Sequence, residues 1–299
     1  FCALYLAAAV RFPRLRLFGL APHMCRGGAA FPTPRRHEPA PPFARLAAGC
    51  NQFRRRDVIF AIVGVGLAVG PDMGDPDLYD GVNHIATANL VAACAEAGVR
   101  RFVFMSSVRA QSGPAAPHVL SERDEPQPSE PYGASKLQAE AAVQDSGVPW
   151  TILRPVMVYG PGVKGNLARL ARLAASPWSL PFASLHARRS LVSVDNLIAA
   201  ISFALTAPAA LGEVFLVADP EPVSLPEILA ALRRGAGRRP GLLPFPPALL
   251  HALLGLAGRD DVWKRLGGDL VVDPGKLIAA GWQPQGDTLG GLAQLARAA

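Results

Sequence analysis

The 299-residue sequence is poor in cysteine, and its few thiols are unevenly placed. Cys2, Cys25 and Cys50 precede residue 57, and only Cys94 follows it. The four thiols include no CxxC pair, so neither a zinc site nor a disulfide framework is indicated, and we expect no metal. A reducing, cytoplasmic location is the resulting expectation.

Acidic residues are almost absent from the first part of the chain. Residues 1–56 hold ten arginines and one acidic residue, Glu38, whereas the remainder holds 20 basic and 22 acidic residues. The net charge of +7 therefore belongs to this first segment, and the body of the protein is close to neutral. A basic protein can bind nucleic acid, but basic and aromatic residues are not interleaved elsewhere, so we expect no nucleic-acid partner.

Long apolar runs are also missing. Residues 1–10 are apolar, but they are too few to cross a bilayer and no basic residue precedes them in the chain. Residues 242–258 are apolar too, yet they include three prolines and His251. This pattern predicts a buried or surface-covering helix rather than a membrane span.

Beyond residue 56, strand and helix patterns alternate. Apolar runs predict buried strands at 57–63, 101–106 and 150–154, and helices are predicted at 78–98 and 135–144, ended by Gly98 and Gly147. Such alternation is typical of a parallel sheet, whose ligands lie beyond the carboxyl ends of the strands. After residue 162 helical patterns dominate, at 165–175, 195–205, 225–234 and 246–256, with short strands at 190–194 and 213–217.

Tyr132 and Lys136 carry the clearest chemical signal. Residues four apart lie on the same face of a helix. An ammonium beside a phenol favours the phenolate and lowers the pKa of the phenol. Such a pair can take a proton from a sugar or alcohol hydroxyl. The same spacing is common by chance on helix surfaces, so the surrounding motifs decide its meaning.

Five motifs in order resemble those of the extended short-chain dehydrogenase/reductase family, in its nucleotide-sugar epimerase/dehydratase branch. They are residues 100–107 (RRFVFMSS), 130–136 (EPYGASK), 153–162 (LRPVMVYGPG), 188–196 (RRSLVSVDN) and 280–284 (AGWQP). The resemblance implies an α/β fold, a Rossmann-like doubly wound parallel sheet with a smaller C-terminal substrate lobe. It divides the chain into an atypical segment 1–56, a dinucleotide-binding core 57–162, and a mainly helical lobe 163–299 that is partly threaded back to the sheet.

The resemblance also implies roles for individual residues. Tyr132 would be the acid/base, Lys136 would hold the nicotinamide ribose, and Ser107, rather than the adjacent Ser106, would hydrogen-bond the reacting oxygen. Tyr132 and Lys136 would also contact the cofactor, and Ser107 the substrate. The other residues that match family positions are Pro155, Ser106 and Asn83 for the cofactor, and Asn166 and Arg189 for the substrate.

These matches imply NAD as cofactor, with NADP as the alternative, a nucleotide-sugar substrate, and a homodimer formed through helices. The implied activity is 4-epimerisation of a UDP-sugar through a 4-keto intermediate. A reductase or dehydrogenase of the same family, or a non-catalytic binding module, would carry the same motifs.

Several of these residues also have purely structural explanations. Ser106 and Ser107 could end a strand and cap the next element. Arg154 and Arg189 could be surface cations with salt partners. Asn83 could satisfy backbone groups inside a helix–loop contact.

The Gly-rich loop that normally opens such a core, G-x-x-G-x-x-G, is not found. The one glycine cluster of that kind, at residues 64–70, has a different spacing and comes after the strand that the register makes the fourth. Glu38 is the only acidic residue near the place of a second strand. We hypothesise that residues 1–56 are an out-of-frame translation of a GC-rich gene, the alternative being a divergent N-terminus. The other reading frames of the coding DNA test this hypothesis, because one of them must encode the glycine motif.

Overall fold

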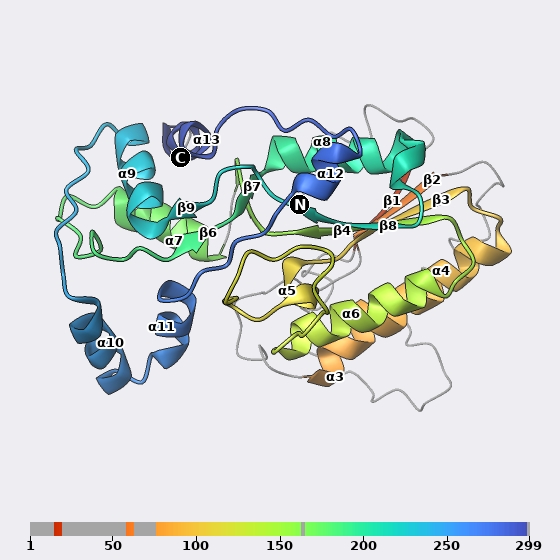
Figure 1. Ribbon diagram of the computed structural model, residues 1–299, viewed down its shortest axis with the longest axis horizontal. Helices are drawn as coiled ribbons and strands as arrows, with labels where there is room; N and C mark the ends of the chain where they lie inside the picture. The colour runs from red at the N-terminus through yellow and green to blue at the C-terminus, as the bar shows by residue number, and fades with distance from the viewer. Residues whose placement is uncertain (1–14, 20–57, 63–75, 163–164, 298–299) are drawn as a thin grey trace, which may run out of the picture. The chain divides into compact units, whose positions relative to one another are not determined.

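The computed structural model describes residues 15–19, 58–62, 76–162 and 165–297, to which all structural statements refer (Figure 1). Most of segment 1–56 and the glycine cluster at 64–70 lie outside the described residues. The chain forms two compact units: the first runs to residue 111 and includes 126–154 and 201–214, and the second comprises 112–125, 155–200 and 215–299. The core and the lobe expected on either side of residue 162 are thus each shared between both units.

A five-stranded sheet in the order β1-β2-β3-β4-β8 organises the first unit (Figure 1). β1 to β4 are parallel neighbours, which confirms the parallel sheet expected from the three apolar runs. β8 joins this sheet from much later in the chain. The strands are β1 (Leu15–Gly19), β2 (Val58–Ile62), β3 (Arg101–Met105), β4 (Trp150–Pro155) and β8 (Glu213–Val217).

Alternate residues of β3 show how helices cover both faces of the sheet. Phe102 and Phe104 are fully buried in a core with α4 and α6. Arg101 points to the other face, because successive strand residues alternate. Its guanidinium donates to the carbonyl oxygens of Ala204 at 2.7 Å and Ala207 at 2.8 Å, at the end of α8. The helices are α3 (Pro76–Tyr79), η2 (Asp80–Ile85), α4 (Ala86–Glu96), α5 (Val108–Gln111), α6 (Pro131–Gln144), α8 (Val194–Thr206) and η3 (Pro208–Ala210).

Two helices of this unit differ from their predicted bounds. The helix predicted over 78–98 spans residues 76–96, but η2 within it is a π-helix. Gly98 ends it with a φ of 65°, as expected of a glycine cap. α6 begins four residues earlier than predicted, because Pro131 has its fixed φ at the first helical position.

The second unit is mainly helical. Its core joins residues of α7, α9 and α13, and Ser224 begins α9 with a capping box formed with Glu227. Strand β5 pairs with β7, and β6 pairs with β9. Its elements are β5 (Met157–Tyr159), α7 (Gly165–Ala174), β6 (Arg188–Arg189), β7 (Leu191–Ser193), β9 (Val223–Ser224), α9 (Leu225–Gly235), α10 (Pro247–Leu256), α11 (Asp260–Leu266), α12 (Gly275–Ala279) and α13 (Thr288–Arg297).

The apolar stretch at 242–258 forms α10. Of the two alternatives, a buried or a surface-covering helix, the first is excluded, because none of the residues of α10 is buried. Among the described helices, none has both the length and the apolar character that crossing a membrane requires.

Candidate active site

Helix α6 carries both residues of the Tyr/Lys pair, one turn apart. Although Lys136 is cationic in water, its side chain is only 4% exposed, and Tyr132 is 9% exposed. A buried lysine is unusual unless it has partners, because removing an ammonium from water is costly. The pair therefore lies inside the first unit rather than on a solvated helix surface.

Tyr132 lies against Ser107, Tyr79 and Arg109. The ring of Tyr79 packs edge-on against that of Tyr132, with centroids 5.7 Å apart. Burial is the largest effect on the phenol and raises the pKa of Tyr132; the hydrogen bond from Ser107 lowers it, Tyr79 raises it and the charge of Arg109 lowers it. The sequence predicted that Lys136 lowers the pKa of Tyr132. In the structure this pKa is raised instead, because the free-energy cost of burying a phenolate is the largest effect.

Lys136 contacts the end of β3. Its Nζ donates to the carbonyl oxygen of Met105 at 3.1 Å and lies 5.0 Å from the ring centroid of Phe104. Burial lowers the pKa of Lys136 to about 7, although the charge of Glu140 raises it. In the protein alone, this side chain therefore changes its charge near neutral pH.

A pH dependence of stability follows from this buried amine. The folded-state pKa of about 7 lies below the ordinary 10.5, so from about pH 7 to 10.5 the unfolded chain holds a proton that the folded protein lacks. The contribution of Lys136 to the unfolding free energy is fully present above pH 10.5 and is lost as the pH falls towards about 7. We expect the unfolding free energy of Lys136→Met, relative to the natural protein, to rise by a few kcal/mol as pH falls through this window. Denaturant unfolding at several pH values measures this difference, and a difference independent of pH would contradict the expectation.

Ser106 and Ser107 have different partners. Ser107 lies between β3 and α5, accepts a hydrogen bond from the backbone N–H of Arg109 at 3.2 Å and donates to Tyr132. It thus both caps α5 and contacts the phenol. The hydroxyl of Ser106 instead donates to the carboxylate of Glu140, so in this structure it serves the packing beneath the pair.

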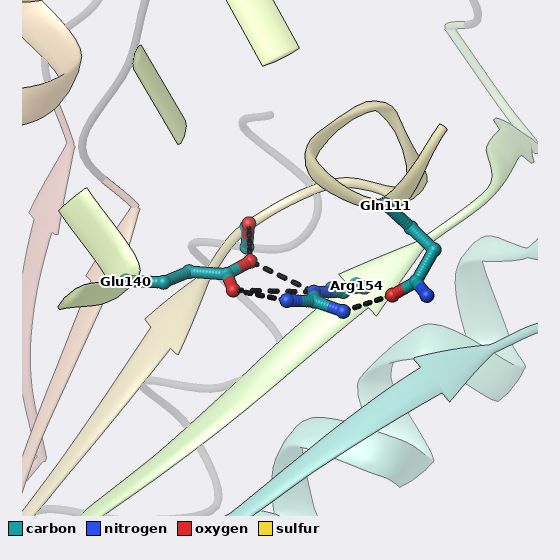
Figure 2. Close-up of polar contacts among 4 residues, drawn as sticks. Gln111, Glu140 and Arg154 are labelled. Carbon is teal, nitrogen blue, oxygen red and sulfur yellow. Dashed lines mark hydrogen bonds and ion pairs between the residues drawn. The ribbon is translucent and has the colours of Figure 1, made fainter. Parts of the chain in front are cut away.

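A buried polar cluster connects four elements of the first unit: the end of β3, α5, α6 and β4. Figure 2 shows the Arg154 guanidinium between the carboxylate of Glu140 and the amide of Gln111. Arg154 Nε lies 2.9 Å from Glu140 Oε1, and its second nitrogen lies 2.5 Å from Oε2. Arg154 is only 5% exposed and Glu140 1%, so the interpretation of Arg154 as a surface cation is wrong. The cluster fixes α6 against the strand ends where Ser107 lies.

Asn83 lies in the π-helical segment η2 and is fully buried. Its Nδ2 donates to Ser135 Oγ at 2.9 Å, and Ser135 Oγ donates to the carbonyl oxygen of Tyr132 at 2.9 Å. Asn83 Oδ1 is buried with no hydrogen-bond partner. An unsatisfied buried acceptor is costly, and π-helical turns are frequent at functional sites. Asn83 therefore does more than satisfy local backbone groups.

Gly133 allows α6 to approach α5 closely. A Cβ at this position would lie 2.2 Å from the carbonyl oxygen of Arg109 and 3.0 Å from Pro128 Cβ. Because the nearest atom is backbone, α6 itself would have to move. This position follows Tyr132 directly, so the shift would reach the phenol.

We expect Gly133→Ala to lower the unfolding free energy by about 1–3 kcal/mol through overpacking and to reduce turnover further by displacing Tyr132. Gly81→Ala is the matched control, because a Cβ at Gly81 has no neighbour within 4 Å. Thermal unfolding and turnover of the two variants give the comparison. Equal stability of both would contradict the close approach.

The structure places the remaining predicted residues in or at the boundary of the second unit. Pro155 ends β4, and Asn166 lies on α7, its side chain outside the described part. Arg189 donates to the carbonyl oxygens of Pro114 at 3.2 Å and Gly268 at 3.0 Å. Its guanidinium thus already joins two backbone segments, and a role toward a diphosphate stays a prediction.

Two further motif residues, Tyr159 and Asn196, serve the fold of this unit. The hydroxyl of Tyr159 donates to Asp219 Oδ2 at 2.8 Å, and Asn196 Nδ2 donates to Asp219 Oδ1 at 2.7 Å. All three side chains are at most 3% exposed. The carboxylate is satisfied by these partners, so both motif residues have a structural role. Trp282, in the last of the five motifs, is 2% exposed.

Some site residues were missed by sequence reasoning. Tyr79, Arg109 and Gln111 are distant in sequence from α6 and have no characteristic spacing to it. Glu140 did have a signal: it continues the row of Tyr132 and Lys136 at intervals of four on an otherwise alanine-rich helix.

The buried groups fit a nicotinamide dinucleotide. The phenol of Tyr132 and the ammonium of Lys136 can bind ribose hydroxyls, and Asn83 Oδ1 offers an acceptor without a partner. Among the described residues, no group of three or more His, Cys, Asp or Glu side chains could hold a metal ion. A doubly wound parallel sheet with Tyr, Lys and Ser at the strand ends defines the class of dinucleotide-dependent enzymes that act on alcohols and sugars.

Comparison with known proteins agrees with this class. Residues 44–218 match the profile of the NAD dependent epimerase/dehydratase family. The UDP-glucose 4-epimerase of Vibrio cholerae is 36% identical over 228 residues, which cover 74% of this chain and 70% of that protein. The chain belongs to the NAD-dependent epimerase/dehydratase family, and the predicted family and fold class are confirmed.

Two more similarities extend the comparison. The N-acetyl-α-D-glucosaminyl-diphospho-ditrans,octacis-undecaprenol 4-epimerase of Escherichia coli O157:H7 is 28% identical over 192 residues, covering 60% of this chain and 56% of that protein. The crystal structure of UDP-glucose 4-epimerase from Thermus thermophilus, a complex with NAD, superposes with a TM-score of 0.64. It is 23% identical, and the match covers 86% of this chain and 81% of that structure.

Proposed function

We propose that the protein is an NAD-dependent 4-epimerase of a UDP-sugar. The proposal depends on one contact, that of the Tyr132 phenol with the Ser107 hydroxyl. Lys136 lies one turn from Tyr132 on the same buried face of α6. The similarity to a UDP-glucose 4-epimerase over 70% of its length supports the substrate class. The NAD present in the structure of the Thermus relative supports NAD over NADP.

In this function Tyr132 takes the proton from the C4 hydroxyl of the sugar. Ser107 donates a hydrogen bond to the same oxygen, which orients it toward the phenol. NAD, when bound, would supply a hydride acceptor for the C4 hydrogen and a positive charge beside the phenol. Inversion requires the 4-keto sugar to turn over in the site, and Tyr132 would then return its proton to the same oxygen. The net reaction inverts C4 and consumes no oxidant.

A positive charge near the phenol is needed to stabilise the phenolate, because burial raises the pKa of Tyr132. Arg109 supplies part of it: its charge lowers this pKa, and its guanidinium lies 2.6 Å from Glu130, which fixes it near the phenol. Asn83 supports the backbone of Tyr132 through Ser135.

Incubation of the protein with UDP-galactose and NAD, followed by separation of UDP-galactose and UDP-glucose, tests this proposal. Approach to the same product ratio from either sugar supports 4-epimerisation. Net oxidation or reduction in step with NAD(H) would instead indicate a dehydrogenase or reductase. Absence of saturable binding of reduced nicotinamide cofactor, followed by fluorescence at millimolar concentration, would favour a non-catalytic binding module.

The remaining expectations belong to the same proposal. Arg189 and Asn166 would contact the diphosphate of the substrate, Pro155 would border the nicotinamide, and two copies would associate through helices. A cytoplasmic location belongs to the proposal as well, on the low cysteine content of the sequence.

A further inference from the structure

Helix α10 turns a row of leucines toward solvent. Leu249, Leu253 and Leu256 are 49%, 49% and 88% exposed, and their spacing of four and three residues places them on one face of the helix. Leu250, on the other face, packs against the core of the second unit. Leu250 thus holds the helix on the second unit, while the leucine row (Leu249, Leu253 and Leu256) is about half or more exposed to solvent. Figure 1 shows α10 beside α11.

Two more exposed apolar side chains lie near the start of α10. Leu243 is 53% exposed and Trp178 is 76% exposed. Their segments are joined, because the N–H of Leu243 donates to the carbonyl oxygen of Leu180 at 2.8 Å. The Arg233 guanidinium donates to the carbonyl oxygens of Trp178 at 3.1 Å and Arg239 at 2.9 Å. A tryptophan held at the border of an apolar surface is typical of a membrane interface.

The segment that carries α10 is rich in arginine, although Glu227 precedes it and Asp260 and Asp261 follow it directly. Residues 228–259 contain five arginines and no aspartate or glutamate. Arg234, Arg238 and Arg239 precede the helix, Arg259 follows it, and all four are exposed. The only titratable residue within the helix is His251, which stacks on Trp263 of α11 with ring centroids 4.6 Å apart. Exposed arginines thus flank the apolar row in sequence, and one carboxylate, that of Asp260, lies beside Gly255 of the helix.

We propose that α10, with Trp178 and Leu243, docks on the surface of an anionic lipid bilayer. The leucine row would enter the acyl boundary, the arginines would meet the anionic headgroups, and the ten-residue helix would lie in the plane of the surface. A second copy of this chain fits this surface less well. A twofold contact places the same patch against itself, so the arginine borders would repel one another.

Flotation with phosphatidylcholine vesicles that contain about 30% phosphatidylglycerol tests the proposal. We expect the full-length protein to float with these vesicles, to bind pure phosphatidylcholine much more weakly, and to dissociate as salt rises from about 0.05 to about 0.5 M. L253D/L256D should lower the apparent lipid affinity at least about tenfold. Leu211→Asp, at a leucine that is 42% exposed in the first unit, is the matched control and should bind like the natural protein.

A second variant, R238E/R239E, changes only exposed charges and should lose binding to the anionic vesicles. Failure of the natural protein to float with anionic vesicles would overturn the proposal, as would equal flotation of L253D/L256D. Light scattering identifies the alternative occupant. Dimers that L253D/L256D dissociates, without any lipid binding by the natural protein, would assign the surface to a second copy and overturn the lipid assignment.

Discussion

Replacement of Tyr132 by phenylalanine is expected to lower turnover by roughly 10³-fold. The substitution removes the proton acceptor and keeps the ring, whose edge-on contact with Tyr79 at 5.7 Å is preserved. Lys136 keeps its hydrogen bond to Met105, so cofactor affinity should change little. Epimerisation assays and cofactor titration by fluorescence separate these two effects.

Tyr79→Phe is the matched control for this change, because it also removes one buried phenol hydroxyl beside the same site. It is expected to retain turnover. Turnover of Tyr132→Phe at the natural rate would show that another group takes the proton. A parallel loss of cofactor binding and turnover would show that the phenol is needed for binding rather than for proton transfer.

Arg154→Met is expected to lower the unfolding free energy by about 3–5 kcal/mol. The Glu140 carboxylate is 1% exposed and has Arg154 as its cation. Without the guanidinium, the buried carboxylate loses its paired cation and keeps the Ser106 hydroxyl and the nearby amine of Lys136. The amide of Gln111 also loses the donor shown in Figure 2.

A double-mutant cycle with Glu140→Met distinguishes the buried pair from simple loss of packing. Removing both charges should cost much less than the sum of the single changes, because neither charge is then left alone. Denaturant unfolding of the four proteins measures the coupling. Arg123→Met, at an exposed arginine, is the control and should stay within about 0.5 kcal/mol of the natural protein. Additive effects of the two buried substitutions would contradict the role of the cluster.

The parallel sheet and the Tyr/Lys pair could be predicted from the sequence because their signals are local. A run such as residues 101–105 is largely apolar since both faces of β3 are buried. Tyr132 and Lys136 share one helix, so a spacing of four is sufficient to place them together.

Contacts between elements could not be predicted in the same way. Ser106 and Ser107 are adjacent, and an extended chain turns them in opposite directions. The residue pattern alone does not say which faces Tyr132, and the choice of Ser107 depended on the family resemblance. Arg154 and Glu140 come from a strand and a helix, and no periodic pattern links them. Asn83 matched a family position, yet the π-helical turn that holds it has no simple residue pattern. The glycine cluster at 64–70 and most of segment 1–56 lie outside the described residues, so the hypothesis of a changed reading frame stays a hypothesis.

The π-helical turn at Asp80–Ile85 bears on how this chain tolerates deletions. A π turn arises when one extra residue is inserted into an α-helix, and it weakens the local hydrogen bonding. Deleting one residue from η2 would restore a regular helix from α3 to α4. The same deletion would rotate Tyr79 and the residues before it by about 100° relative to the rest of the helix. Tyr79 and Asn83 could then no longer both face α6. The deletion would therefore make the helix more stable and would remove part of the support of Tyr132. One residue of chain length thus exchanges stability for activity.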